Sequence, residues 1–342
     1  MSSSTKSKSK GKETNGNSKN NPKDEMPKVV SKTESNIKGA RPKTSSKPEK
    51  SNKDTAAKQQ PLVSVKTGLK VLLMNASGPS EGDKPSKRRK QAIQNVINKH
   101  NPDLILFQEF LWKGIHGKTW LADPVPEHYQ LTGNTDASIL YNINELIVEE
   151  NPTGELQRIL EELQRATSEH PTPIPQDFAP ISRMSIRMVK TKVVPVMEFI
   201  CISWHGRHSG IDDLEKVIQF RHLMIFVKEI RAKNNSLPIL LAGDFNVDMD
   251  IISREVEDPF ELHEYKASKR RKKKGVIDYF IATTELRLKD MKPVDLKKDS
   301  KADKPEDVLD HDPIIAMLEP SQLSTAVPTP DKTAIKMSKK AK

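Results

Sequence analysis

Residues 240–246 read LLAGDFN, an apolar strand that runs directly into an aspartate and an asparagine. An unbroken apolar run of this length is typical of a strand buried on both faces. Asp244 and Asn246 then stand at its carboxyl end. An unpaired buried carboxylate is very costly, so a strand ending in ionisable groups directs them out of the core. The stretch therefore predicts a polar site at the edge of a buried sheet.

The same arrangement recurs in both directions along the chain. Polar residues border five further apolar runs, and they are Asn75, Gln108, Glu109, His205, Asp278, Asp310 and His311. One such residue alone is more often a solvated turn residue than a ligand. Six such strand ends in one chain, all with residue types that bind metals or move protons, favour a shared polar cleft.

The apolar runs are short and are separated by helical patterns, which indicates alternating strands and helices. We expect strands at 69–74, 104–107, 193–203, 238–242, 276–281 and 313–318. Apolar stripes with helical spacing occur at 93–97 and 156–163. A further helix is expected over 212–231, with Leu214, Val217, Ile218 and Ile225 facing inward.

Charge divides the chain into three parts. Residues 1–66 hold 16 basic and 6 acidic residues, and residues 320–342 hold 5 and 1. Both ends are too poor in apolar residues to offset the entropy of ordering, and we expect them to be disordered tails. Residues 67–319 hold 36 basic and 39 acidic residues and are expected to form one domain. The strongly basic balance therefore describes the tails and not the folded part.

Residues 1–66 contain no apolar stretch of a secretory signal, and no run of 18 apolar residues occurs in the sequence. The single cysteine, Cys201, lies within an apolar run and fits a reducing compartment. We therefore expect a protein of the nucleus or cytoplasm that has no membrane segment.

The residue types at the strand ends limit the chemistry. One cysteine and scattered histidines give no usual zinc spacing. There is no G-x-S-x-G motif to mark a serine nucleophile. Carboxylate and amide oxygens suit Mg²⁺ or Mn²⁺, and a carboxylate with a histidine can orient and deprotonate water. Metal-assisted hydrolysis of a phosphate ester uses all of these parts.

These motifs, in this order, resemble those of the DNase I-like endonuclease/exonuclease/phosphatase superfamily. The resemblance is carried by Asn75, Gln108-Glu109, the G-D-F-N of 243–246, Ile277-Asp278-Tyr279 and the D-H-D-P of 310–313. It covers about residues 70–318. It implies an α+β fold with four layers, α/β/β/α, in which two mixed sheets pack face to face and the active site lies at one end.

The resemblance also implies roles for the matching residues. Glu109 would be the main Mg²⁺ ligand, with Asn75 beside it and Asp310 acting through water. Asp244 would orient or deprotonate the attacking water, and Asn246 would hold the phosphate. His311 would contact the scissile phosphate, with Asp278 fixing its tautomer, and His205 would protonate the leaving oxygen.

The substrate stays open at this level, because such folds share one catalytic arrangement and differ in their loops. DNA or RNA is favoured by the basic run of Lys269, Arg270, Arg271 and Lys272, which would bind a polyanion beside the cleft. A solvated loop or a nuclear-localisation signal is an equal interpretation of this run. The alternatives are a phosphatase or phosphodiesterase of small or lipid esters, and a non-catalytic nucleic-acid adaptor. We expect a monomer.

Overall fold

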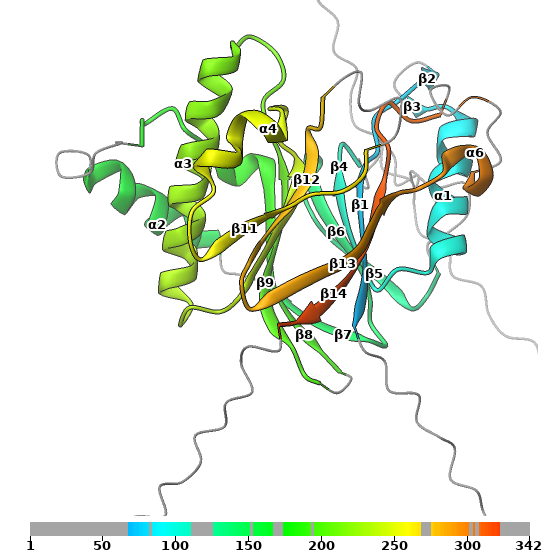
Figure 1. Ribbon diagram of the computed structural model, residues 1–342, viewed down its shortest axis with the longest axis horizontal. Coiled ribbons are helices and arrows are strands. Elements are labelled where there is room, and N and C mark those ends of the chain that lie inside the picture. The colour runs from blue at the N-terminus through cyan, green and yellow to red at the C-terminus, as the bar shows by residue number, and fades with distance from the viewer. Residues whose placement is uncertain are drawn as a thin grey trace, which may run out of the picture. The chain divides into compact units, whose positions relative to one another are not determined.

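Figure 1 shows the computed structural model of the protein, in which two six-stranded sheets lie face to face between helices. The structure describes residues 68–81, 84–110, 126–150, 153–166, 174–192, 195–267, 275–300, 304 and 308–321. The tail expected at 1–66, and all but the first two residues of the tail expected at 320–342, lie outside these residues.

The first sheet is mixed and is centred on β1 (Leu69–Asn75). Its strand order is β13 (Leu286–Pro293), β14 (Ile314–Pro320), β1, β4 (Leu104–Gln108), β6 (Ala137–Asn142) and β5 (Tyr129–Gly133). Strands β1 and β4 run parallel, and the other neighbours are antiparallel. The short hairpin of β2 (Ser80–Glu81) and β3 (Lys84–Pro85) follows β1.

The second sheet repeats this plan around β10 (Ile239–Asp244). Its order is β11 (Phe260–His263), β12 (Asp278–Thr283), β10, β9 (Glu198–His205), β8 (Met184–Thr191) and β7 (Leu146–Glu150). Strands β9 and β10 run parallel. Each sheet therefore places the carboxyl ends of two neighbouring parallel strands at the same edge.

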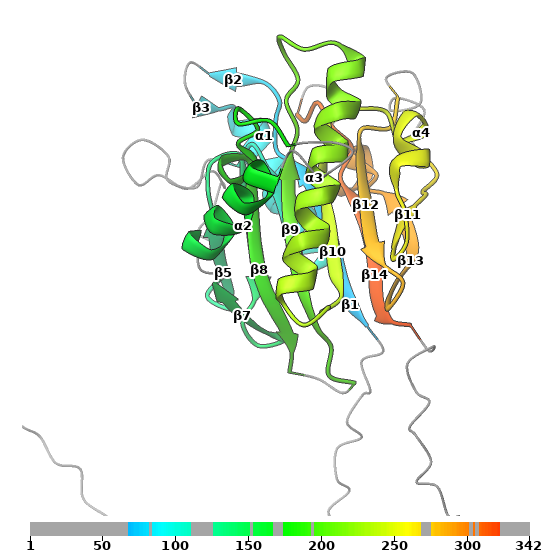
Figure 2. The ribbon, with the colours of Figure 1, turned by 90° about the vertical axis from the view of Figure 1, so that its left-hand side faces the viewer.

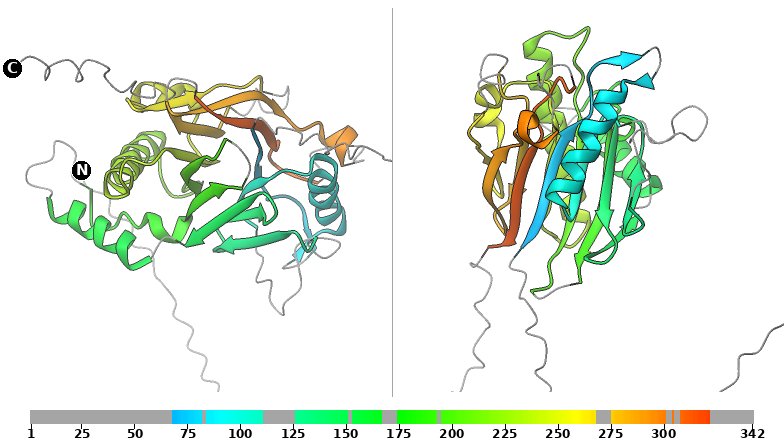
Figure 3. Two further views of the ribbon diagram at one scale, coloured as in Figure 1. Left: turned by 90° about the horizontal axis from the view of Figure 1, so that it is seen from below. Right: turned by 90° about the vertical axis from the view of Figure 1, so that its right-hand side faces the viewer.

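Helices cover the outer faces of both sheets (Figures 2 and 3). On the first sheet lie α1 (Lys87–His100) and the short α6 (Leu296–Asp299); on the second lie α2 (Thr153–Arg165) and α3 (Asp213–Lys233), with α4 (Met249–Ile252) beside α3. Short 3₁₀ turns span Pro180–Arg183 and Ser253–Glu255.

The alternation of side chains along each strand builds the layers. In β1, Val71 and Leu73 pack between the sheets, whereas Leu72 and Met74 pack against α1. In β9, Cys201 faces the first sheet and is fully buried. Both faces of the central strands are thus covered, which explains their unbroken apolar runs. This arrangement confirms the four-layer α/β/β/α sandwich.

Two expectations about the second sheet and its helix were wrong. The strand expected at 193–203 begins at Glu198, and β8 had been overlooked because its alternation of apolar, polar and charged residues gives no continuous apolar run. Leu214 does not face inward: it lies in the first turn of α3 and is 66% exposed. The inward face begins at Val217, because the first turn of α3 follows the capping box of Asp212 and Glu215.

The chain enters and leaves the sandwich at the edge opposite to Asn75. Leu69 at the start of β1 pairs with Leu318 near the end of β14. The seven residues of β1 separate this edge from Asn75, a distance of about 20 Å at the usual rise per residue. Among the described residues, no helix has the length and apolarity needed to span a membrane.

Candidate active site

The polar residues expected at strand ends meet at one edge of each sheet. Asn75 and Gln108 are the last residues of β1 and β4, and they are cross-strand partners. In the second sheet Asp244, the last residue of β10, pairs with His205 on one side and Asp278 on the other. Residues more than 30 positions apart in sequence therefore stand in adjacent register positions.

A buried hydrogen bond joins the two sheets at this edge. Asn75 Nδ2 donates to Asp244 Oδ2 at 2.9 Å, and Asn75 Oδ1 accepts from the backbone N–H of Ser77 at 2.9 Å. Asn75 and Asp244 are each only 2% exposed. The amide is thus held at both ends and fixes the position of the carboxylate opposite.

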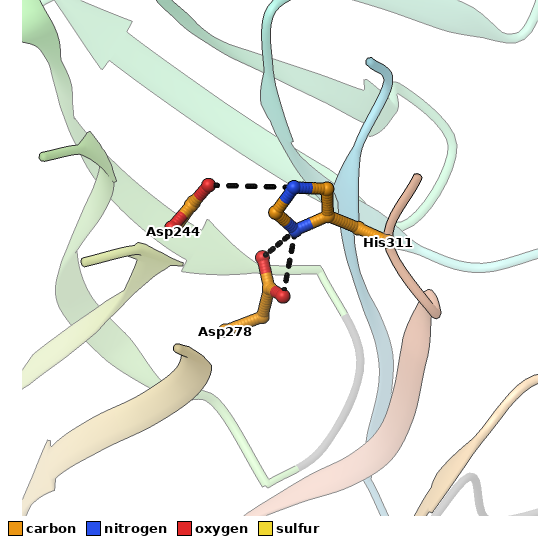
Figure 4. A group of neighbouring side chains, drawn as sticks. All are labelled: Asp244, Asp278 and His311. Atoms are coloured by element: carbon orange, nitrogen blue, oxygen red, sulfur yellow. Dashed lines mark hydrogen bonds and ion pairs between the residues drawn. The ribbon is translucent and has the colours of Figure 1, made fainter. Parts of the chain in front are cut away.

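His311 lies between two carboxylates, as Figure 4 shows. Its Nδ1 is 2.8 Å and 3.0 Å from the two carboxylate oxygens of Asp278. Its Nε2 is 3.7 Å from Asp244 Oδ2. A carboxylate beside Nδ1 fixes the tautomer that carries its proton there and turns Nε2 toward Asp244.

The environment of Asp244 favours its protonated form. Burial, followed by the charge of Asp278, raises the pKa of Asp244. His311, the backbone N–H of Asn246 and the Asn75 amide oppose that rise. A carboxyl group whose pKa lies nearer neutrality is a better proton acceptor at physiological pH than an ordinary aspartate.

Asn246 is positioned by the turn that follows β10. Its backbone is left-handed, with φ 55°, a conformation that asparagine tolerates better than most residues. Its N–H donates to Asp244 Oδ1 at 2.9 Å, and its Nδ2 donates to the carbonyl of Gly206 at 2.9 Å. The second hydrogen of this amide remains for another acceptor.

Glu109 and His205 form a second pair at the same edge. Glu109 follows β4 with φ 53°, and its Oε1 lies 3.5 Å from His205 Nε2. The His205 ring is 4% exposed, and neither ring nitrogen has a hydrogen-bond partner within the described part of the chain. Burial and the Arg183 charge lower the pKa of His205 to about 4, so the ring is neutral at pH 7.

Arg89 is a site neighbour that the sequence interpretation missed. It belongs to the basic run of residues 87–90 at the start of α1, and charged side chains in such a run are usually exposed to solvent. Instead it is 4% exposed, and its Nη1 donates to the carbonyl of Gly78 at 2.9 Å. Burial lowers the pKa of Arg89, and the charges of Glu109 and Asp310 oppose that shift. Serine is a preferred N-cap residue, and Ser86 at this position fixes where α1 begins and therefore which residues of its first turn face inward. This is the local sequence signal that could have indicated the burial of Arg89.

Asp310 is the most exposed of the expected metal ligands. Its backbone N–H donates to the carbonyl of Ser77 at 3.1 Å, which ties the segment before His311 to the segment after Asn75. The other expected substrate contacts, Lys269, Arg270, Arg271 and Lys272, lie outside the described residues. Gly275, which closely follows them, stands near Asp248 in the loop after β10.

Gly243 permits β9 and β10 to approach at the site. A Cβ at this position would lie 1.9 Å from the Trp204 carbonyl oxygen, a backbone atom. We expect Gly243→Ala to lower the free energy of unfolding by about 2 kcal/mol or more, because the clash can be relieved only by moving a central strand. Urea unfolding of the purified variant measures this.

Gly154 in α2 supplies the matched control for that substitution. A Cβ there meets nothing within 4 Å. Gly154 is the second residue of α2, so Gly154→Ala should leave stability unchanged or raise it by less than about 1 kcal/mol. Equal urea midpoints for the two variants would contradict the steric argument.

Several of these residues could hold a metal ion. Ligand atoms of Asp244, Asp278 and His311 all lie within 4.8 Å of one another. Asp278 and His311 already interact with each other, because His311 Nδ1 lies at hydrogen-bond distance from the Asp278 carboxylate. Glu109 offers a carboxylate whose side chain is 40% exposed. Hard cations prefer such oxygen donors, so Glu109 is the better candidate for the main ligand.

A mixed two-sheet sandwich with carboxylates, amides and histidines gathered at one end is the architecture of the DNase I-like fold. The sequence model of the Endonuclease/Exonuclease/phosphatase family matches residues 74–311, and the chain belongs to this family. No curated protein sequence matches the chain. Members of this family are typically hydrolases that act on phosphodiester bonds and generally depend on divalent metals.

Solved structures share the fold at low sequence identity. The human Nocturnin catalytic domain with a bound sulfate anion is 13% identical, with a TM-score of 0.51 over 75% of this chain and 94% of that one. A family protein from Bacteroides thetaiotaomicron is 18% identical, with a TM-score of 0.48 over 74% and 95%. D. rerio TDP2 complexed with single strand DNA product is 12% identical, with a TM-score of 0.48 over 74% and 100%.

Proposed function

We propose that this protein is a Mg²⁺-dependent phosphodiesterase that hydrolyses nucleic acid, with Mn²⁺ able to replace Mg²⁺. The observation that carries the proposal is the chain of contacts from Asn75 through Asp244 and His311 to Asp278 at one sheet edge. It combines a buried proton acceptor with a histidine whose tautomer is fixed by a second carboxylate. No side-chain nucleophile is needed, because water can be the attacking group.

The residues present fit a hard divalent cation. Glu109 presents a solvent-accessible carboxylate, and the nearby His205 Nε2 is buried and makes no hydrogen bond with the described residues, as expected where a ligand completes the site. Asn75 Oδ1 has a second lone pair that could bind the cation. Asp310 and Glu109 both lie close enough to Arg89 for their charges to raise its pKa, so the two carboxylates lie in the same region. When bound, the cation would polarise the phosphate and stabilise the developing negative charge.

The protein's own groups then divide the work. Asp244 accepts a proton from the attacking water, whose oxygen bonds to phosphorus while the bond from phosphorus to the leaving oxygen breaks. The leaving oxygen takes its proton from bulk water. His311 Nε2 binds a phosphate oxygen, while Asp278 holds the Nδ1 proton. Asn246 donates its remaining amide hydrogen to the phosphate, where negative charge grows.

His205 acts differently from the role implied by family resemblance. A ring with a pKa of about 4 is almost wholly neutral at pH 7, so it rarely carries the proton that a general acid must donate. We assign it the role of a neutral hydrogen-bond donor to substrate oxygen. Its unpartnered ring nitrogens and its place beside Glu109 support this assignment.

The preference for nucleic acid rests on charge beside the site. Arg89 and Arg183 lie next to Glu109 and His205, and the basic run ends just before the segment 275–277 that leads into Asp278. The carbonyl of Val276 accepts from the backbone N–H of Met249, the first residue of α4, and the carbonyl of Ile277 accepts from the N–H of Phe245, just after β10. A polyanion crossing this edge would lie in the positive potential of these groups, to which Arg89 contributes from below the surface.

The test is a cleavage screen of the full-length protein. Plasmid, single-stranded DNA, RNA, a p-nitrophenyl phosphodiester and inositol phosphates are incubated with Mg²⁺ and, separately, with EDTA. We expect strand cleavage in Mg²⁺ and none after chelation. Turnover of the small esters alone would favour the small-ester alternative. Nucleic-acid binding that needs residues 1–66, with no turnover of any substrate, would favour the adaptor.

Glu109→Gln tests the assignment of the metal ligand. Replacing one carboxylate oxygen with an amide weakens binding of a hard cation, so the half-saturating Mg²⁺ concentration should rise by about tenfold or more. A Mg²⁺ titration of cleavage measures it. The matched control is Glu127→Gln, a like change at a residue outside the cluster. An unchanged Mg²⁺ requirement in Glu109→Gln would place the ion elsewhere, with the group of Asp244, Asp278 and His311 as the alternative.

A further inference from the structure

A cavity of about 200 Å³ lies on the outer face of the second sheet, beside the candidate active site. One wall is the amino-terminal half of α3, and the other is the segment from Pro175 to Arg183. Figure 2 shows α3 crossing this face and extending past the end of β9. The volume falls below the roughly 300–1,000 Å³ of pockets for drug-sized ligands, and it suits a single small ring system.

The floor of this cavity is aromatic and apolar. Phe178, Trp204 and His222 line it, and each is at most 8% exposed. Phe178 and His222 meet edge to face, with ring centroids 5.5 Å apart. Ile218 adds an aliphatic wall from α3 and is half-buried. Flat hydrophobic surfaces of this kind bind planar rings.

The rim of the cavity is polar and carries both signs of charge. Arg183 and Arg207 line it, and Arg183 Nη1 donates to the carbonyl of His205 at 2.9 Å. Asp177 and Glu215 are exposed and also line it. A planar ring with hydrogen-bond donors on its edge, attached to an anion, satisfies both kinds of group. An acyl chain would leave this charged rim without partners.

The cavity adjoins the end of β9, where the catalytic edge of the second sheet lies. Arg183, which lines the cavity, donates to the carbonyl of His205, although the Trp204 and His205 side chains point to opposite faces of β9. A smaller cavity shares Trp204 and Arg207 with this pocket and is also lined by Phe245, the residue before Asn246. A group bound in the larger cavity would therefore lie near the end of β9, where Asn246 donates to the carbonyl of Gly206.

We propose that this cavity binds one nucleobase of the substrate, stacked on the Phe178 and Trp204 floor with its phosphate directed past the end of β9 toward Asn246. The proposal rests on the proposed function for the identity of the phosphate. The arginines hold the backbone at the mouth, and the carboxylates accept hydrogen bonds from the base edge. Base stacking on aromatic side chains tolerates every base, so the pocket would confer a requirement for a base without strong sequence preference.

The test compares an intact single-stranded DNA oligonucleotide with one that carries a tetrahydrofuran abasic residue at a single position. In the full-length protein we expect at least one bond flanking that residue to be cleaved about tenfold more slowly than in the intact oligonucleotide. Ile218→Trp fills the cavity. It should slow cleavage of the intact oligonucleotide by about tenfold and bring the ratio between the two oligonucleotides close to one.

Leu214→Trp is the matched control. It lies one turn earlier on α3, is 66% exposed and does not line the cavity. It should cleave both oligonucleotides as the unmodified protein does. Equal base dependence in Ile218→Trp and Leu214→Trp would overturn the proposal. A loss in Ile218→Trp confined to lysophospholipid turnover would also overturn it, because the cavity would then hold an acyl chain.

A binding measurement separates this proposal from the proposed function. Fluorescence anisotropy of the same two oligonucleotides is measured in EDTA with Asp244→Asn protein, with and without Ile218→Trp. Weaker binding of the intact oligonucleotide upon Ile218→Trp would support the pocket, and it would do so even if the unmodified protein cleaved no substrate in Mg²⁺, a result that would refute the hydrolase. Cleavage in Mg²⁺ with no base dependence in any variant would refute the pocket and leave the hydrolase in place.

Discussion

Asp244→Asn is expected to lower kcat/KM for phosphodiester cleavage by roughly 10³-fold to 10⁴-fold. The amide keeps the size of the side chain but cannot accept a proton from water. It also has one oxygen, whereas the carboxylate accepts from Asn75 Nδ2 and from the Asn246 N–H with different oxygens. Single-turnover cleavage of the substrate found in the screen measures the loss directly.

The folded state should survive this substitution. Because the pKa of Asp244 is raised in the folded protein, keeping the group ionised costs stability as pH rises from its ordinary pKa through the raised one. The amide removes that cost and loses one hydrogen bond, and the two effects oppose each other. We expect the Tm at pH 7 to change by no more than about 4 °C.

Asp248→Asn is the matched control for Asp244→Asn. Asp248 lies four residues further along the same loop, where its carboxylate caps α4 by accepting from the Asp250 N–H. Asparagine is an equally good N-cap, so activity and Tm should both stay near those of the unmodified protein. A comparable loss of activity in both variants would show that the loop, and not the Asp244 carboxylate, limits the reaction.

The raised pKa of Asp244 also predicts the acid side of the pH profile. Catalysis needs the ionised carboxylate, so kcat/KM should fall at a pH above the ordinary aspartate pKa of about 4 as the medium is acidified. Asp244→Glu lengthens the side chain and alters its burial, which should shift the pH at which kcat/KM falls. If kcat/KM falls at the same pH in Asp244→Glu, the titrating group is a different residue.

The sequence predicted the fold because the central strands are covered on both faces. The apolar runs of β1, β4 and β10 are continuous for that reason, and their polar last residues mark the edge where the strands stop. Strands β5, β6, β7, β8, β11 and β13 were not predicted. Strands β5, β7, β11 and β13 are the edge strands of the two sheets and β8 lies next to one, so their exposed and buried positions alternate and the apolar signal is weak. Strand β6 is buried throughout, but polar residues border its apolar run of only Ile139 to Tyr141.

The residues of the candidate site could be predicted from the sequence, but the hydrogen bonds between them could not. Strand ends identify Asn75, Asp244, Asp278 and His311, but the hydrogen bond between Asn75 and Asp244 depends on how two separate sheets stack. Arg89 could not be found by residue type, because a run of four basic residues gives no sign of which one is buried. Its inward direction is set by the helical rotation that starts at Ser86.

His311→Ala should lower kcat by about 10²-fold to 10⁴-fold, since it removes the ring that faces both Asp244 and the phosphate. Asp278→Asn should produce a smaller loss. The amide can still accept from Nδ1–H through its oxygen, but it no longer supplies the charge that stabilises a protonated ring. Asp278→Asn should bind the oligonucleotide in EDTA as tightly as the unmodified protein. His311→Ala should bind it more weakly, because only the His311 ring is assigned a contact with the phosphate.

The double variant Asp278→Asn/His311→Ala decides whether Asp278 acts through His311. Asp278 is 2% exposed and approaches His311 with both carboxylate oxygens, so its effect on catalysis should vanish once the ring is gone. The double variant should then be no slower than His311→Ala alone, since residues that act as a unit are strongly non-additive. Losses that multiply in single-turnover kinetics would mean that Asp278 contacts the substrate or the metal by itself, as the three-residue cluster with Asp244 would allow.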